Sequence, residues 1–207
     1  MRSIQPTVRF LFSHPAHWIA LGGGSGLPAR APGTWGTACG WVVFDLIRQL
    51  AGATMAPGIE SALGPTLGTA SAPAGLAAGL PWPWLAVCCA TFVIGAWAAG
   101  RTGADLGVPD SGHIVIDEIV AFWLVLAWLP WLPFPAPLRL AGGLPAQALA
   151  FVVFRFFDIV KPPPIGYLDA RLKNGWGVMV DDLVAAGFSL IVLVAGALAA
   201  RWLLPGG

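Results

Sequence analysis

The sequence predicts an all-α fold, a polytopic membrane helical bundle with about five membrane-embedded helices and its motif loops on the cytoplasmic face. Composition is the first reason: 57% of the 207 residues are hydrophobic, only 10% are charged, and the mean hydropathy is +0.76. A soluble domain of this length cannot bury so much apolar surface, so lipid is the expected solvent. The second reason is a series of apolar segments of bilayer-crossing or nearly bilayer-crossing length. We treat residues 1–207 as a single membrane-embedded domain.

Five segments are expected to be embedded: residues 35–50, 85–100, 119–138, 140–154 and 183–200. The last is the clearest, because it carries no charge before Arg201. The first is the weakest, because it contains Asp45 and Arg48, which at i,i+3 can pair on one helix face. Prolines between 130 and 137 are expected to end the third segment. Residues 52–81 are rich in Ala, Gly and Pro, and predict a flexible loop or insert.

The distribution of charge predicts the orientation. With a cytoplasmic N-terminus, most of the 11 Lys and Arg residues lie inside, as the positive-inside tendency requires. The exceptions are Arg48, Arg139 and Arg201. The same topology places three polar loops on the cytoplasmic side, at residues 22–37, 101–118 and 155–182. Most of the acids lie in these loops too. The positive-inside tendency concerns Lys and Arg and does not explain the acids, so we expect a functional site on that face.

Several classes of protein are excluded or disfavoured. No basic stripe suggests nucleic acid. The cysteines form no CxxC pair, and none is followed by Arg at the spacing of a Cys-x5-Arg phosphatase. A small transporter stays an alternative, although it would favour ionisable groups near the middle of the membrane.

Five carboxylates are expected near one membrane depth, at the ends of three helices: Asp117, Glu118, Asp158, Asp181 and Asp182. Oxygen ligands of this kind suit a hard cation such as Mg²⁺. Two alternatives stay open. In the first, Asp117 and Asp181 cap helix N-termini and have no other role. In the second, Asp158 lies at a helix C-terminus, where the dipole disfavours an anion, and serves only to form a salt bridge with Arg155 or Lys161.

The glycine-rich stretch "GGGSGLPARAPGTWGT", residues 22–37, offers flexible backbone, exposed N–H groups and the side chains of Ser25, Arg30 and Thr34. Such a nest can bind an anion. It lacks the Walker pattern, and Pro28 argues against a dinucleotide fingerprint. The alternative is a plain membrane-entry loop in which Pro32 begins a helix.

Three blocks carry a resemblance to a known family: "GSGLPARAPGTWGT", "DSGHIVIDEIVAFW" and "FRFFDIVKPPPIGYLDARLKNGWGVMVDDLVAAG". Over residues 15–48 and 83–195 the chain resembles the phosphatidylglycerophosphatase A family. The resemblance implies a Mg²⁺-dependent phosphatase of the bacterial inner membrane, and the charge distribution places its active face on the cytoplasmic side. It would remove the terminal phosphate of phosphatidylglycerophosphate, a phospholipid substrate, to give phosphatidylglycerol. Two departures are Ala121, where the family pattern has Gly, and the length of residues 52–81.

The resemblance and the acids together suggest roles. The expected metal ligands are Asp117, Glu118, Asp158, Asp181 and Asp182, with Asp117 bound to the ion directly or through another ligand. The expected catalytic residues are Glu118, Asp158, Lys161 and Asp182. The expected substrate-binding residues are Ser25, Arg30, Gly33, Thr34 and Arg155. Lys161 and Arg155 would stabilise phosphoryl oxygens. The alternative for Lys161 is that its side chain merely extends to the membrane–water interface to keep its charge in water. The nucleophile is either water activated by the ion or a carboxylate such as Asp158.

Other enzymes with related chemistry fit less well. The sequence "SGH" at residues 111–113 matches one block of membrane acid phosphatases, but no later His can serve as their nucleophile. The Asp-Gly-x2-Ala-Arg motif of CDP-alcohol phosphotransferases is missing. A phosphatase for another lipid phosphate stays open, as does the oligomeric state.

Overall fold

The computed structural model describes residues 5–54, 82–135, 143–163, 165–167 and 174–203, and no β-strand occurs among them. Five longer helices make up most of this part: α3 (Pro32–Thr54), α5 (Trp82–Leu106), α6 (Ile116–Trp128), α8 (Leu144–Val160) and α10 (Gly175–Leu203). Shorter elements are α1 (Val8–Leu11), α2 (Pro15–Ala20) and the 3-10 turns η1 (Gly22–Gly24) and η4 (Leu129–Trp131). The predicted all-α class is confirmed. Residues 55–81, most of the expected insert, lie outside the described residues, and residues 52–54 belong to α3.

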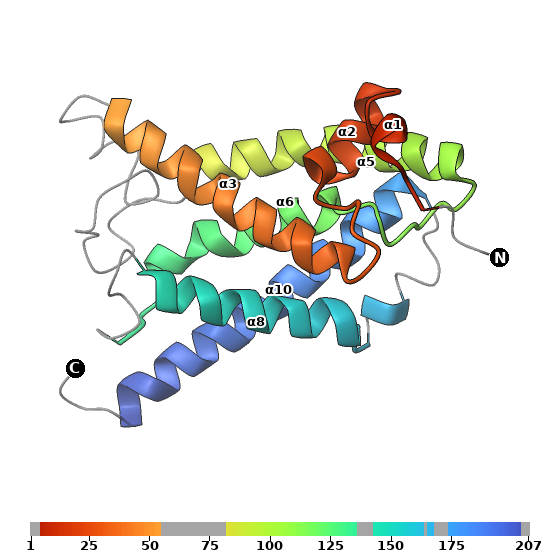
Figure 1. Ribbon diagram of the computed structural model, residues 1–207. Coiled ribbons are helices and arrows are strands. Elements are labelled where there is room, and N and C mark those ends of the chain that lie inside the picture. The colour runs from red at the N-terminus through yellow and green to blue at the C-terminus, as the bar shows by residue number, and fades with distance from the viewer. Residues whose placement is uncertain (1–4, 55–81, 136–142, 164, 168–173, 204–207) are drawn as a thin grey trace.

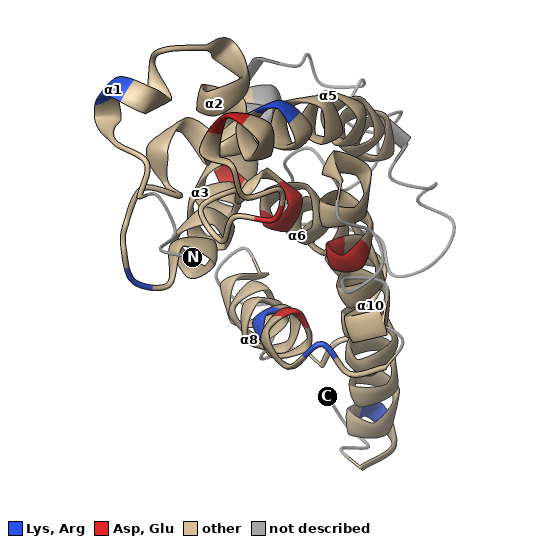
Figure 2. Ribbon diagram, turned by 90° about the vertical axis from the view of Figure 1, so that its right-hand side faces the viewer, with Lys and Arg blue, Asp and Glu red and all other residues tan. Residues whose placement is uncertain are grey.

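Helix α6 is the centre of the bundle. It packs against α10, α3 and α5, and Figure 2 shows it between the other helices. Its residues Val120, Ala121, Phe122 and Val125 are all buried, as expected for a helix that is apolar on every side. The methyl group of Ala121, the departure from the family pattern, is accommodated in this core.

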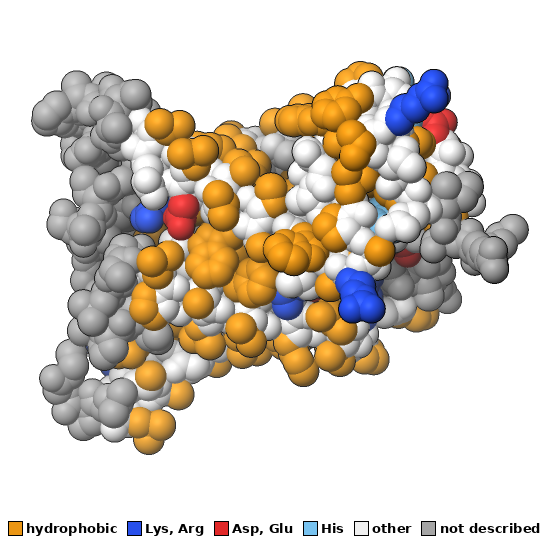
Figure 3. Space-filling view, viewed as in Figure 1, with side chains coloured by type: hydrophobic (Ala, Val, Ile, Leu, Met, Phe, Trp, Pro, Cys, Tyr) orange, Lys and Arg blue, Asp and Glu red, His pale blue; other side chains and the backbone are white. Residues whose placement is uncertain are grey.

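Two helices are long and apolar enough to cross a membrane, over Pro83–Leu106 and Gly175–Leu203. Only 33% and 28% of their most apolar windows are buried inside the protein, so much of their apolar surface faces outward. Hydrophobic side chains such as Val42 and Val152 are also exposed on α3 and α8, and Figure 3 shows the apolar face that these helices present. The topology of five crossings stays a prediction.

The third predicted segment is shorter than the expected 119–138. Helix α6 has 13 residues, and the chain continues only as the turn η4 before Leu132 adopts an extended conformation. Pro130 and the prolines after it lack the N–H that a continuing helix needs, and each disfavours helical backbone in the residue before it. The helical part of this segment is therefore well below the roughly 20 residues that a straight crossing requires.

The N-terminal elements hold the chain that leads into α6. His17 of α2 contacts Asp105 near the end of α5 through Nε2 and Oδ2 at 2.9 Å, and Val115 donates its N–H to Ala20 O at 2.9 Å. In η1 the backbone takes positive φ at Gly22, Gly23 and Gly24, a conformation that favours glycine. The "GGG" run therefore serves a tight turn that brings the polar loop back onto the bundle.

The long helices alternate in direction, so that the starts of α3, α6 and α10 meet the ends of α5 and α8 at one end of the bundle (Figure 1). Figure 2, which looks onto this end, shows acidic residues on α6, α8 and α10. Farther along α3, Arg48 Nη2 lies 3.4 Å from Asp45 Oδ1, which confirms the predicted pair. This pair is linked to α8, because Gln147 donates to Asp45 Oδ1 at 3.2 Å and accepts from Trp41.

Candidate active site at the converging helix ends

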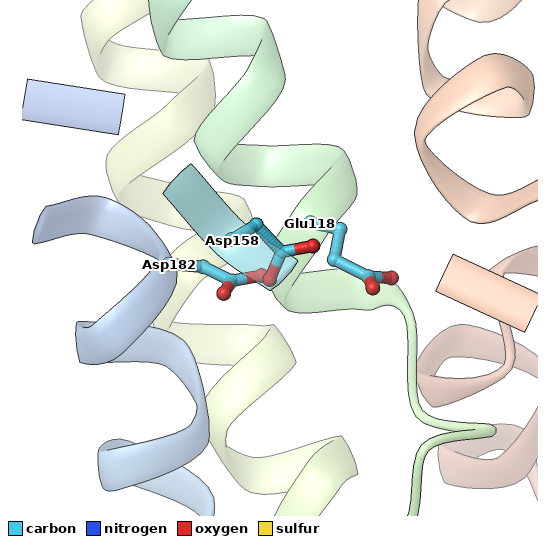
Figure 4. Close-up of side chains that lie close together, drawn as sticks. All are labelled: Glu118, Asp158 and Asp182. Carbon is cyan, nitrogen blue, oxygen red and sulfur yellow. The ribbon is translucent and has the colours of Figure 1, made fainter. Parts of the chain in front are cut away.

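Three carboxylates from three helices share one small volume (Figure 4). Glu118 of α6, Asp158 of α8 and Asp182 of α10 each offer one oxygen, and these three oxygens lie within 4.8 Å of one another. Asp158 is 8% exposed and Asp182 2%. The sequence predicted this convergence of helix ends, and the geometry selects these three acids from the five proposed.

Arg155 binds two of these three carboxylates. Its Nη1 donates to Glu118 Oε1 at 3.2 Å and also to Asp158 Oδ2. The same nitrogen lies 3.5 Å from Thr37 Oγ1 of α3, whose hydroxyl donates to Gly33 O at 2.9 Å. Arg155 and Asp158 stand at i,i+3 on α8, so one helix face presents both. A single guanidinium nitrogen thus links α3, α6 and α8.

Lys161 reaches the site from the turn after α8. Its backbone is left-handed, with φ 43 and ψ 57, and its N–H bonds Phe157 O at 2.9 Å, which ends the helix. Three prolines follow it in the sequence, and proline is common just beyond a helix C-terminus. The Lys161 ammonium donates to Asp181 Oδ2 on α10. Of the two partners expected for Asp158, Arg155 is confirmed, whereas Lys161 pairs with Asp181.

Asp117 and Asp181 flank the three clustered acids. Asp117 Oδ1 accepts the N–H of Glu118 at 3.0 Å, so this acid does serve a backbone group in the first turn of α6. Asp181 does not cap its helix: α10 begins at Gly175, and Asn174 accepts the N–H of Gly177 at 2.9 Å. The capping interpretation is wrong for Asp181, because the helix starts earlier than the apolar run that marked it in the sequence.

Burial and the closeness of the acids dominate the electrostatics of the cluster. Burial, and next the nearby Asp158, raise the pKa of Glu118 from 4.5 to about 8, although Arg155 opposes this. Burial and the neighbouring Glu118 raise the pKa of Asp117 well above its ordinary value. Glu118 Oε2 and Asp182 Oδ2 are buried without a hydrogen-bond partner. Because a buried carboxylate oxygen without a partner is costly, these residues fit a hard divalent ion.

Gly33 is the point at which α3 touches the site. A Cβ atom at this position would lie 1.8 Å from Glu118 Oε1 and 3.1 Å from Arg155 Nη1. Gly36, one turn further, similarly leaves room for Val115, where a Cβ would come within 2.5 Å. The spacing of Gly33, Gly36, Thr37 and Gly40 on one helix face could have revealed this close approach in the sequence.

The other residues predicted to bind substrate are Ser25, Arg30 and Thr34. Ser25 Oγ donates to Gly22 O at 2.9 Å within its own turn. Ser25 also lines a groove on the outer face of α3, beside Pro28 and Trp35. Arg30 is exposed, and Thr34 is half-buried in the first turn of α3. Of the glycine-rich stretch, Gly33 and Thr37 reach the site, and the contact of Thr37 with Arg155 was not predicted.

The sequence of the chain is similar to those of known proteins. A sequence model of the family Phosphatidylglycerophosphatase A matches residues 18–197. A Phosphatidylglycerophosphatase A of Haemophilus influenzae is 34% identical over 195 residues, which cover 94% of this chain and 96% of the relative. That of Escherichia coli is 30% identical over 186 residues, covering 89% and 85%. A Bacteroides thetaiotaomicron relative, provisionally named a phosphatidylinositol-3-phosphatase, is 32% identical over 186 residues, covering 90% and 93%. No solved structure matches significantly.

The relatives and the helical fold together define the class of the protein: it is an enzyme, a helical phosphatase. Within that class, the chain belongs to the Phosphatidylglycerophosphatase A family, and the matched span holds Glu118, Asp158 and Asp182. The resemblance seen in the three sequence blocks is confirmed.

Proposed function

We propose that this protein hydrolyses the terminal phosphate monoester of phosphatidylglycerophosphate to give phosphatidylglycerol, a step of phospholipid biosynthesis, with the help of Mg²⁺. Its family and the names of two relatives support the substrate. The observation that carries the chemistry is the group of three buried carboxylates from three helices, whose oxygens lie within 4.8 Å of one another.

Glu118, Asp158 and Asp182 would hold the ion, which supplies positive charge to polarise the phosphoryl group. Lys161 stands next to the cluster, where its ammonium donates to Asp181, and its side chain is 29% exposed. It is therefore suited to stabilise the charge that develops on the phosphoryl oxygens. Arg155 withdraws charge from Asp158 by binding it, which favours water over that carboxylate as the nucleophile.

A membrane location fits this reaction. The two helices of crossing length and the exposed apolar side chains of α3 and α8 suit lipid contact, and both substrate and product are lipids. We propose the bacterial inner membrane, with the converging helix ends at the cytoplasmic surface. There the anionic headgroup meets the polar residues while the acyl chains stay in the bilayer.

The test is phosphate release by the purified protein in detergent. We expect release from phosphatidylglycerophosphate with Mg²⁺ and none with EDTA. Asp182→Asn should lower turnover by at least ~10²-fold, the scale of one lost charge-stabilising group. The matched control is Asp110→Asn, an exposed acid at the same end of the bundle, which should keep wild-type turnover. Absence of release by the folded wild type with Mg²⁺ would remove the proposal.

A second substrate has one specific support, the provisional name of the Bacteroides relative. Phosphatidylinositol 3-phosphate is therefore the comparison substrate in the same assay. A higher kcat/KM for this lipid than for phosphatidylglycerophosphate would replace the proposed substrate and keep the chemistry of the site.

A further inference from the structure

We infer that Arg155 is a positioning residue of the metal site, which orients Glu118 and Asp158 for the ion, and that it does not bind the substrate phosphate. The inference rests on the proposed function, because it assumes that these carboxylates hold a divalent ion. The sequence suggested that this arginine binds substrate. The reasons for the different role are the hydrogen bonds that its nitrogens already make and the burial of Nε.

The first reason is how the carboxylate oxygens are divided. Arg155 Nη1 takes Oε1 of Glu118 and Oδ2 of Asp158. It leaves Oε2 of Glu118 buried and without a hydrogen-bond partner, and Oδ2 of Asp182 is in the same state. An arginine that holds one oxygen of each carboxylate fixes its rotation and leaves a second oxygen for an ion. Partners of metal ligands act in this way in other proteins.

The second reason is that side-on recognition of a phosphate, through Nε and Nη1, is closed to this guanidinium. Nη1 already contacts three oxygens, on Glu118, Asp158 and Thr37. Nε is buried by protein atoms and has no hydrogen-bond partner. Side-on recognition of a phosphate uses Nε together with a terminal nitrogen, so it needs Nε to be accessible. The Arg155 side chain is only 13% exposed, against 29% for Lys161.

The third reason is that Arg155 alone, among the residues that the structure describes, bonds both of these carboxylates. Asp117 fixes the backbone N–H of Glu118, not its carboxylate. Without Arg155, the Glu118 and Asp158 carboxylates would repel each other inside a poorly solvated site and rotate apart. The geometry that the ion needs would then be lost, although every ligand would still be present.

The experiment compares Mg²⁺ affinity and lipid kinetics in three variants of the purified protein. Isothermal titration with MgCl₂ gives Kd, and phosphate release at saturating Mg²⁺ gives KM for phosphatidylglycerophosphate. Arg155→Gln should weaken Mg²⁺ binding by ~10–100-fold, the range seen when partners of metal ligands are removed, with KM little changed. Arg155→Lys should recover part of the Mg²⁺ affinity, since lysine keeps the positive charge but lacks the planar guanidinium group with its several N–H donors. The control Arg101→Gln alters an exposed arginine paired with Asp105 and should match the wild type.

Other results overturn the inference in distinct ways. Unchanged Mg²⁺ affinity with a raised KM would make Arg155 a phosphate ligand. Tighter Mg²⁺ binding in Arg155→Gln would show that the arginine competes with the ion for the same oxygens. If Arg155→Gln fails to fold, Arg155→Lys decides by the same two measurements. A wild type that hydrolyses the lipid but binds no Mg²⁺, or that does neither, would instead remove the metal from the proposed function and this inference with it.

Discussion

Replacing Gly33 by alanine tests the site through a single methyl group. The new Cβ would lie 1.8 Å from Glu118 Oε1, whereas ordinary van der Waals contact begins at 3.4 Å. Gly33 lies in the first turn of α3 and does not have a left-handed φ, so its backbone tolerates alanine. The strain therefore falls on the Glu118 side chain and on Arg155 Nη1, which a Cβ would approach to 3.1 Å.

The size of the effect follows from these distances. To restore contact at 3.4 Å, Glu118 Oε1 must withdraw by about 1.6 Å from a Cβ placed at 1.8 Å. Metal-ligand distances tolerate only ~0.2 Å. Glu118 should then no longer reach the ion or Arg155. We expect this loss to weaken Mg²⁺ binding by ~10–100-fold. That corresponds to ~1.4–2.8 kcal/mol. Turnover at fixed, subsaturating Mg²⁺ should fall in parallel.

The assay is Mg²⁺ titration of Gly33→Ala together with phosphate release. The control is Gly187→Ala, the same change on α10 at a position where a Cβ meets nothing within 4 Å, and it should behave as the wild type. The double variant Gly33→Ala/Glu118→Asp supplies a rescue, because aspartate is one methylene shorter and gives the methyl group room. It should bind Mg²⁺ more tightly than Gly33→Ala alone.

The reasoning is refuted if Gly33→Ala keeps wild-type Mg²⁺ affinity while folded. Glu118 would then not be held against α3 as described. It is also refuted if the two changes of the double variant simply add, since contacting residues should show coupling in such a cycle.

Three further predictions concern pH and packing. Because the pKa of Glu118 is raised from 4.5 to about 8, the folded protein binds more protons than the unfolded chain between these values, so metal-free stability should fall as pH rises through this window. Thermal melts with EDTA from pH 5 to 8 would show it, and a flat profile would contradict it. Over the same range Mg²⁺ affinity should rise, because protons and the ion compete for Glu118; calorimetry at each pH tests this. Gly175→Ala would place a Cβ 2.1 Å from Ala96 O, a backbone atom, and should lower the melting temperature clearly, unlike Gly187→Ala.

Much of the fold and the identity of the family could be predicted from the sequence. Hydrophobic runs and helix periodicity are local properties, so α3, α5, α8 and α10 were each located near their observed positions. The placing of acids at helix ends was also visible, because it depends only on where the apolar runs stop. The prolines were expected to end the segment of α6, but the helix stops at Trp128, before the first of them, and the early start of α10 was missed. Exact helix ends depend on terminal turns and capping more than on hydropathy.

Which acids lie close enough together to hold an ion was decided by the tertiary structure. Neighbouring residues on a helix point about 100° apart, so the pairs Asp117–Glu118 and Asp181–Asp182 could each send only one member into the cluster. The rotation of α6 and α10 against their neighbours selected Glu118 and Asp182. The same packing placed Arg155 against Glu118 of α6 and Thr37 of α3. The sequence by itself determined the residue types, the helices and the family, whereas side-chain direction depends on how whole helices pack and cannot be read from local pattern.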